Sequence, residues 1–108
     1  MKVDFRLKKE KDFEIAFKKG KRIFSQNLTL VYLPAENLKA GFAVSKKHGG
    51  SVVRNRIKRL LRESFRSFLP NFRQNFFFVF IPKVSDNYDL ETFKKEMNYL
   101  FTKGGFLV

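Results

Sequence analysis

The sequence predicts an α+β fold: an α/β sandwich with one mixed sheet and elements in the order α-β-β-α-β-α. Two changes of apolar period support this prediction. Residues 24–33 alternate between faces as a strand does, whereas residues 52–68 repeat at helical spacing. Residues 76–81 are apolar without alternation, which is typical of a strand covered on both faces. The length of 108 residues and the 44% apolar content indicate a single domain over residues 1–108 with its own core.

The first expected elements are a helix and a strand. The helix covers residues 10–19, because acidic residues begin it, lysines end it and Gly20 follows. The strand covers residues 24–33 and places Leu30 and Tyr32 on the same face.

A hairpin is expected next. Pro34 ends the first strand, and residues 34–37 are suited to a turn. A second strand is then predicted over residues 39–47, paired with the first. Residues 48–51 form a loop that leads into the most basic part of the chain.

The central helix is expected to start after an N-cap at Ser51 and to be closed by Pro70. Steps of about 100° per residue divide it into two faces. The apolar face contains Val53, Ile57, Leu60, Leu61, Ser64, Phe65 and Phe68. The opposite face contains Asn55, Lys58, Arg59, Arg62 and Arg66, with Arg54 and Arg56 on the flanks. One side is therefore suited to a core, and the other is cationic.

The last two elements are a central strand over residues 74–83 and a helix over residues 90–102. Asp89 or Asp86 is suited to cap the start of that helix, and Gly104 with Gly105 to stop it.

The charge is concentrated rather than spread. The chain has 23 basic and 10 acidic residues, a formal net charge of +13. Residues 46–66 hold eight basic residues against Glu63 alone, net +7, and residues 1–22 hold nine against four, net +5. A solubilising surface mixes both signs, so this distribution indicates a binding face for a polyanion. Arginine forks bind phosphate at two points, which favours nucleic acid over a solvated helix face.

The sequence offers little for catalysis by side chains. It has no Cys, and its one histidine, His48, is expected to be an exposed loop residue. No group of His, Asp and Glu has metal-ligand spacing, so no cofactor is expected on the protein alone. The chain opens with charged residues instead of an export signal and has no apolar run long enough to span a bilayer, which predicts a soluble cytoplasmic protein.

Residues 45–63, which read SKKHGGSVVRNRIKRLLRE, resemble the signature of the bacterial ribonuclease P protein subunit. The core of the signature is Arg54-Asn55-Arg56, followed by Lys58, Arg59 and Arg62 in the spacing of that family. The segment from Arg6 to Gly20 is similar to the family's N-terminal helix. The resemblance covers nearly the whole chain and is weakest after residue 84.

The resemblance implies both a fold and a function. The fold is the α/β sandwich called ribosomal protein S5 domain 2-like, with an unusual left-handed βαβ crossover around the arginine-rich helix. The partner is one large catalytic RNA per protein, and together they remove the 5′ leader of precursor tRNA. The RNA holds Mg²⁺ and performs the hydrolysis, so the protein is an accessory subunit that needs no membrane and no obligate protein partner.

The resemblance also implies two binding surfaces. The surface for the catalytic RNA consists of Arg56, Lys58, Arg59, Arg62 and Arg66. The other is a cleft between the first helix and the sheet for the single-stranded leader, formed by Phe13, Phe17, Leu30, Tyr32, Lys47, Arg54 and Asn55. Stacking on aromatic rings tolerates any base sequence, as leader binding requires.

Three other functions remain open on the residues alone. A different small RNA-binding protein, such as a ribosomal one, would share the charge without the cleft. An autonomous protein nuclease would cleave without RNA. A membrane-surface role is disfavoured, because the apolar face of the central helix is needed for the core.

Overall fold

The computed structural model describes residues 5–7, 9–69, 71–85 and 88–108. The helices are α1 (Glu10–Lys19), α2 (Ser51–Arg66) and α3 (Leu90–Gly104), with a one-turn 3₁₀ helix η1 (Lys46–His48) before α2. The strands are β1 (Lys21–Phe24), β2 (Leu28–Pro34), β3 (Lys39–Phe42) and β4 (Phe76–Pro82). They form one mixed sheet in the order β1-β2-β4-β3.

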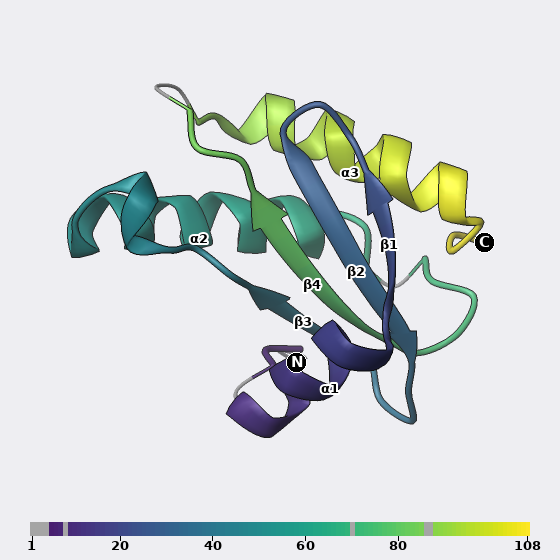
Figure 1. The fold of residues 1–108 in the computed structure, drawn as a ribbon. Helices are drawn as coiled ribbons and strands as arrows, with labels where there is room; N and C mark the ends of the chain where they lie inside the picture. Colours follow the sequence, from purple (N-terminus) through teal and green to yellow (C-terminus); the bar gives the residue numbers. More distant parts are fainter. Residues whose placement is uncertain (1–4, 8, 70, 86–87) are drawn as a thin grey trace.

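The sheet separates two layers of helices (Figure 1). Helix α1 lies on one face, and α2 and α3 lie together on the other. The most apolar strand, β4, occupies the interior of the sheet between β2 and β3, as the continuous apolar run predicts. The α+β class is confirmed.

The larger core lies between the sheet and the pair α2 and α3, and it is rich in aromatic side chains. Phe65 of α2, Phe78 and Phe80 of β4 and Phe101 of α3 are fully buried. Their ring centroids lie between 5.5 and 6.3 Å apart. Burial of each such ring contributes about 1.5–3 kcal/mol to stability.

The predicted single strand over residues 24–33 is wrong, because the chain turns within it. β1 and β2 form an antiparallel hairpin in which Phe24 pairs with Thr29. The turn between them contains neither Gly nor Pro. It is closed by a hydrogen bond from the backbone N–H of Ser25 to the carbonyl of Leu28, 2.8 Å long.

The predicted hairpin between residues 24–33 and 39–47 is also wrong. β3 pairs in parallel with β4 and not with β2, because the apolar β4 lies between β2 and β3. Both edges of β4 are thereby hydrogen-bonded to a neighbouring strand. The strand is shorter than expected, since the chain leaves the sheet after Phe42 and forms η1. The outer edge of β3 is partly closed by residues 5–7, where Ala40 exchanges backbone hydrogen bonds with Phe5 and Leu7.

Helix α2 therefore connects two adjacent parallel strands, and this crossover is left-handed, as expected. With the strands of Figure 1 turned to point upward, β4 lies to the right of β3 and α2 lies behind the sheet. Nearly all βαβ crossovers have the opposite hand, so this connection distinguishes the fold from ordinary α/β proteins.

The ends of the helices differ in part from the predictions. The N-cap of α2 is Gly50, not Ser51, and α2 ends at Arg66. Val53 is 42% exposed and so lies outside the core. Asp89 caps α3 by accepting a hydrogen bond from the backbone N–H of Thr92, 2.8 Å long. Pro70 and Asp86 lie outside the described residues.

Candidate nucleic-acid interface

Helix α2 carries one cationic face. Ile57, Leu61, Ser64 and Phe65 are its buried residues and fix the side that meets the sheet and α3. The basic residues predicted for the surface that binds the catalytic RNA project elsewhere: Arg56, Arg59 and Arg66 are exposed, and Lys58 and Arg62 are half-buried. The structure thus brings all five onto the outer side of one helix.

Arg62 lies at the centre of a cluster of like charges. Burial lowers the pKa of its guanidinium, and the charges of Arg6, Arg66 and Arg59 lower it further. A lowered pKa of a base means that folding disfavours its charged form, yet an arginine stays protonated at neutral pH. Its Nε is buried and donates no hydrogen bond to a described protein group. This arrangement is suited to an anion brought by a partner.

The start of α2 lies beside a short turn that the histidine holds in place. Nε2 of His48 lies 2.8 Å from the carbonyl oxygen of Pro82 and donates to it, which ties η1 to the end of β4. Gly49 has φ +134°, a conformation that favours glycine, and the helix begins two residues later. His48 is therefore a half-buried structural residue and not an exposed loop residue.

Three residues predicted for the leader cleft lie in this part of the chain, Lys47 in η1 and Arg54 and Asn55 near the start of α2. Lys47 and Asn55 are exposed, and Arg54 is half-buried. The Nε of Arg54 is buried without a described hydrogen-bond partner, as in Arg62.

Helix α1 packs against the sheet through very close contacts. The ring of Phe13 lies so near Gly41 of β3 that a Cβ there would be 2.5 Å from its Cζ. At the other end of the helix, a Cβ on Gly20 would lie 2.7 Å from Cγ1 of Val31 in β2. Ala16, between these two points, is fully buried. Helix α1 therefore crosses the sheet along the row of residues from Gly41 to Val31.

Phe13 and Phe17 lie on the same flank of α1. Four residues advance a helix by about 400°, so the two rings are about 40° apart. Asp12 lies on the other flank, where it lines a cavity of about 350 Å³ with Lys39 and Phe77. Phe17 is 37% exposed, whereas Phe13 is half-buried against the sheet.

The sheet surface on the Phe17 side of α1 is formed by the next row of residues. Strand pairing places Phe24 beside Thr29 and Thr29 beside Ile81. Ala43 directly follows Phe42, the last residue of β3, which pairs with Phe80, so Ala43 is in register with Ile81. Thr29, Ile81 and Ala43 are half-buried, and Phe24 is 59% exposed. We call these four residues the outer row.

Leu30 and Tyr32 do not face α1, so their predicted place in the cleft is wrong. Leu30 is fully buried in the core on the α2 and α3 side. The ring of Tyr32 packs there against Phe106 and Phe76, with centroids 4.8 and 6.1 Å away. The alternation of β2 turns Val31 and Thr29 toward α1 instead, and these residues were missed because alternation defines two faces without identifying which one α1 covers.

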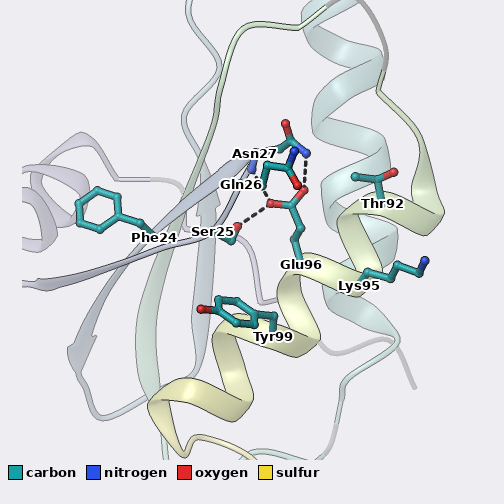
Figure 2. A pocket seen from close by; sticks show the side chains of 8 residues that line it. All are labelled: Phe24, Ser25, Gln26, Asn27, Thr92, Lys95, Glu96 and Tyr99. Atoms are coloured by element: carbon teal, nitrogen blue, oxygen red, sulfur yellow. Dashed lines mark hydrogen bonds between the residues drawn. The ribbon is translucent and has the colours of Figure 1, made fainter.

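A separate pocket of about 560 Å³ lies between the β1–β2 turn and α3 (Figure 2). At its centre, the carboxylate of Glu96 accepts hydrogen bonds from the hydroxyl of Ser25 and from the backbone and side-chain nitrogens of Asn27, at 2.5–2.7 Å. These bonds fasten the hairpin to α3.

Within the described parts of the chain, no three His, Cys, Asp or Glu side chains are grouped as a metal site would require. No helix among these same residues is both long and apolar enough to cross a membrane.

A model of the family described as Ribonuclease P matches residues 1–105. The chain belongs to the ribonuclease P protein family. It is 39% identical to the ribonuclease P protein component of Caldanaerobacter subterraneus subsp. tengcongensis, over 91% of this chain and 87% of that protein. Membership makes the chain the protein component of an endoribonuclease of tRNA processing.

Solved structures agree with this assignment. The ribonuclease P protein of Thermotoga maritima has a TM-score of 0.80 at 26% identity, covering 91% of this chain and 96% of that one. The protein of Staphylococcus aureus, at 22% identity, shows the same fold with a TM-score of 0.84, covering 98% of this chain and 100% of that one. The ribosomal protein S5 domain 2-like fold of ribonuclease P proteins is thereby confirmed.

The like-charge cluster predicts that Arg62→Met stabilises the isolated protein. Methionine keeps the long apolar stem and removes a charge that folding disfavours, so the free energy of unfolding in urea should rise at low salt. The gain should shrink as salt screens the cluster.

Lys11→Met is the matched control, because the exposed Lys11 lies among Glu10, Asp12 and Glu14 and its charge is attracted instead of repelled. Arg62→Met lowering stability at every salt concentration would contradict the prediction.

Proposed function

We propose that this chain binds the catalytic RNA of its ribonuclease P through the outer face of α2 and the 5′ leader of precursor tRNA beside α1. It thereby assists Mg²⁺-dependent removal of the leader, which yields the mature 5′ end of the tRNA. The RNA holds the metal and performs the hydrolysis, one protein serves one RNA, and the complex acts in the cytoplasm. No obligate protein partner and no membrane take part.

The observation that carries the proposal is the arginine cluster around Arg62. Three arginines surround a fourth whose burial already disfavours its charge, and such an arrangement costs stability in the isolated protein. Phosphate oxygens would accept hydrogen bonds from these guanidinium groups and neutralise them. Binding of an RNA backbone would therefore explain why the protein keeps an arginine cluster that lowers its own stability.

Leader binding is supported by the surface beside α1. Phe17 is exposed at the edge of the outer row, and Phe13 lies next to it on the same flank. Stacking on such rings contributes ~1–3 kcal/mol per base without reading sequence. Lys47 lies four residues after Ala43, and Arg54 and Asn55 lie near the start of α2; these polar groups would meet the phosphates of the leader.

The cationic surfaces also explain how a protein without a described metal site can change a metal-dependent reaction. Two RNAs that meet in one complex repel each other through their phosphates, and Mg²⁺ offsets that repulsion. Seven excess positive charges over residues 46–66 supply part of the same screening. The protein should therefore lower the Mg²⁺ concentration that cleavage requires.

Reconstitution with the cognate RNA tests this function. At low Mg²⁺, cleavage of precursor tRNA should require both components, and at high Mg²⁺ the RNA alone should cleave. Cleavage by the purified protein free of RNA would identify an autonomous nuclease and overturn the proposal. Co-purification with ribosomal RNA in place of one large RNA would favour the ribosomal alternative.

The α2 surface predicts a change in salt dependence. Replacing Arg59 and Arg62 with Ala should weaken binding of the catalytic RNA and reduce the slope of log affinity against log salt by about one unit per lost phosphate contact. Binding is measured by filter retention over a salt series. Lys103→Ala on α3 is the control and should leave the slope unchanged; an unchanged slope in the double variant would remove α2 from the interface.

The surface beside α1 predicts a selective loss for Phe17→Ala. Affinity for precursor tRNA should fall roughly 5- to 150-fold in the reconstituted complex, corresponding to the loss of one stacked base, while affinity for mature tRNA stays the same. Ile15→Ala is a matched control, because Ile15 is 38% exposed but lies on the other flank of α1. Equal losses for both tRNAs would exclude leader binding at this surface.

A further inference from the structure

We infer that Phe24 forms an additional stacking subsite, which takes an unpaired leader base farther along the leader than the bases that contact α1. Glu96 is the positioning residue that holds the Phe24 ring in place. The inference rests on the proposed leader binding and adds to it a subsite at the end of the edge strand.

Phe24 is the last residue of the edge strand β1, and its ring is 59% exposed. Cross-strand partners share a face of the sheet, so its pairing with Thr29 places it on the face that α1 partly covers. The preceding residue, Ile23, packs into the core on the opposite face, as strand alternation requires. Figure 2 shows the ring of Phe24 directed away from α3. Phe24 also lines the pocket beside α3, but its exposed ring extends the outer row on the face that α1 partly covers.

The spacing suits a strand of RNA lying along the row. Neighbouring strands are about 4.8 Å apart, so Phe24 on β1 lies about 10 Å from Ile81 on β4. Successive bases along one strand of a stacked duplex are about 3.4 Å apart, so this distance corresponds to a few nucleotides. Arg22 shares the face of Phe24 because it pairs with Val31, and its exposed guanidinium can meet the phosphate of the stacked base. A ring flanked by a cation is the combination that binds single-stranded nucleic acid without sequence preference.

Glu96 explains how an edge strand with a turn that lacks Gly and Pro keeps this ring in place. One carboxylate oxygen accepts the Ser25 hydroxyl at 2.6 Å and the Asn27 backbone N–H at 2.5 Å, and the other accepts the Asn27 amide at 2.7 Å. All three bonds are charge-assisted, and they cross 69 to 71 residues of sequence. Because Ser25 directly follows Phe24, this attachment orders the end of β1 before RNA arrives. Pre-ordering lowers the entropic cost of stacking a base there.

The test uses the reconstituted complex and precursor tRNAs whose leaders are lengthened one nucleotide at a time. Phe24→Ala should bind short-leader substrates as the wild type does. It should lose roughly 5- to 150-fold in affinity once the leader reaches the ring. An abasic nucleotide at that position should weaken binding to the wild type and have no effect on Phe24→Ala. Phe24→Trp should restore the affinity.

Tyr99→Ala is the matched control, since Tyr99 is 51% exposed and lines the pocket on the α3 side. It should match the wild type at every leader length. A Phe24→Ala loss that is independent of leader length, or no loss at all, would overturn the subsite. If Phe17→Ala remains selective for precursor tRNA in the same assay, only the subsite fails. If neither phenylalanine discriminates precursor from mature tRNA, the proposed leader binding fails with it.

The role of Glu96 is tested by a double-variant cycle. Glu96→Ala should reduce affinity only for leaders long enough to reach Phe24, and it should cause no further loss in the Phe24→Ala background. Binding of the catalytic RNA reports whether the fold is intact and should stay unchanged. Equal losses for short and long leaders, or full additivity with Phe24→Ala, would show that Glu96 does not act through this ring.

Discussion

The position of the cationic helix depends on one aromatic side chain, Phe65. Its ring centroid lies 5.0 Å from that of Phe5, 5.4 Å from Phe72 and 6.2 Å from Phe101, so a single residue joins α2 to the N-terminal segment, the loop before β4 and α3. The charges on the outer face of α2 repel one another and oppose folding. Burial of this ring with Ile57 and Leu61 offsets that repulsion and fixes which side of the helix faces outward. The RNA surface proposed above is thus set by packing on the opposite side of the same helix.

Local patterns in the sequence were enough to predict the helices and the buried strand. Acidic starts, basic ends and Gly20 define α1, and the helical period after residue 51 defines α2. The β1–β2 turn was not predicted, because Ser25 and Asn27, although common in turns, also fit the alternation of a continuous strand, and the group that stabilises the turn, Glu96, lies on α3. The partner of β3 could not be predicted either, because β3 and β4 are separated in sequence by α2. Whether they pair depends on which strands best cover the apolar β4.

The positions of the residues predicted for binding differ in the same way between α2 and β2. Arg56, Arg59 and Arg66 of α2 are exposed as predicted, since a helical period assigns each side chain to one face once the apolar side is known, although Val53 was wrongly assigned to the core. Strand β2 is apolar on both faces, so alternation alone left its orientation open, and Tyr32 was assigned to the face that Val31 occupies. Phe24 was counted as part of a continuous strand. Its exposure follows only from the hairpin and the edge position of β1.

The parallel pairing of β3 with β4 has a consequence for the nascent chain. Among the residues that the structure describes, β4 is the last strand to be synthesised, and β3 has no other strand of the sheet beside it. Every basic residue of α2 therefore leaves the ribosome before the strand that buries the apolar side of that helix. Until Pro82 has been added, the apolar side of α2 lacks the strand that covers it. Completion of β4 fixes the orientation of α2, so the shape of the proposed RNA surface is set late in synthesis.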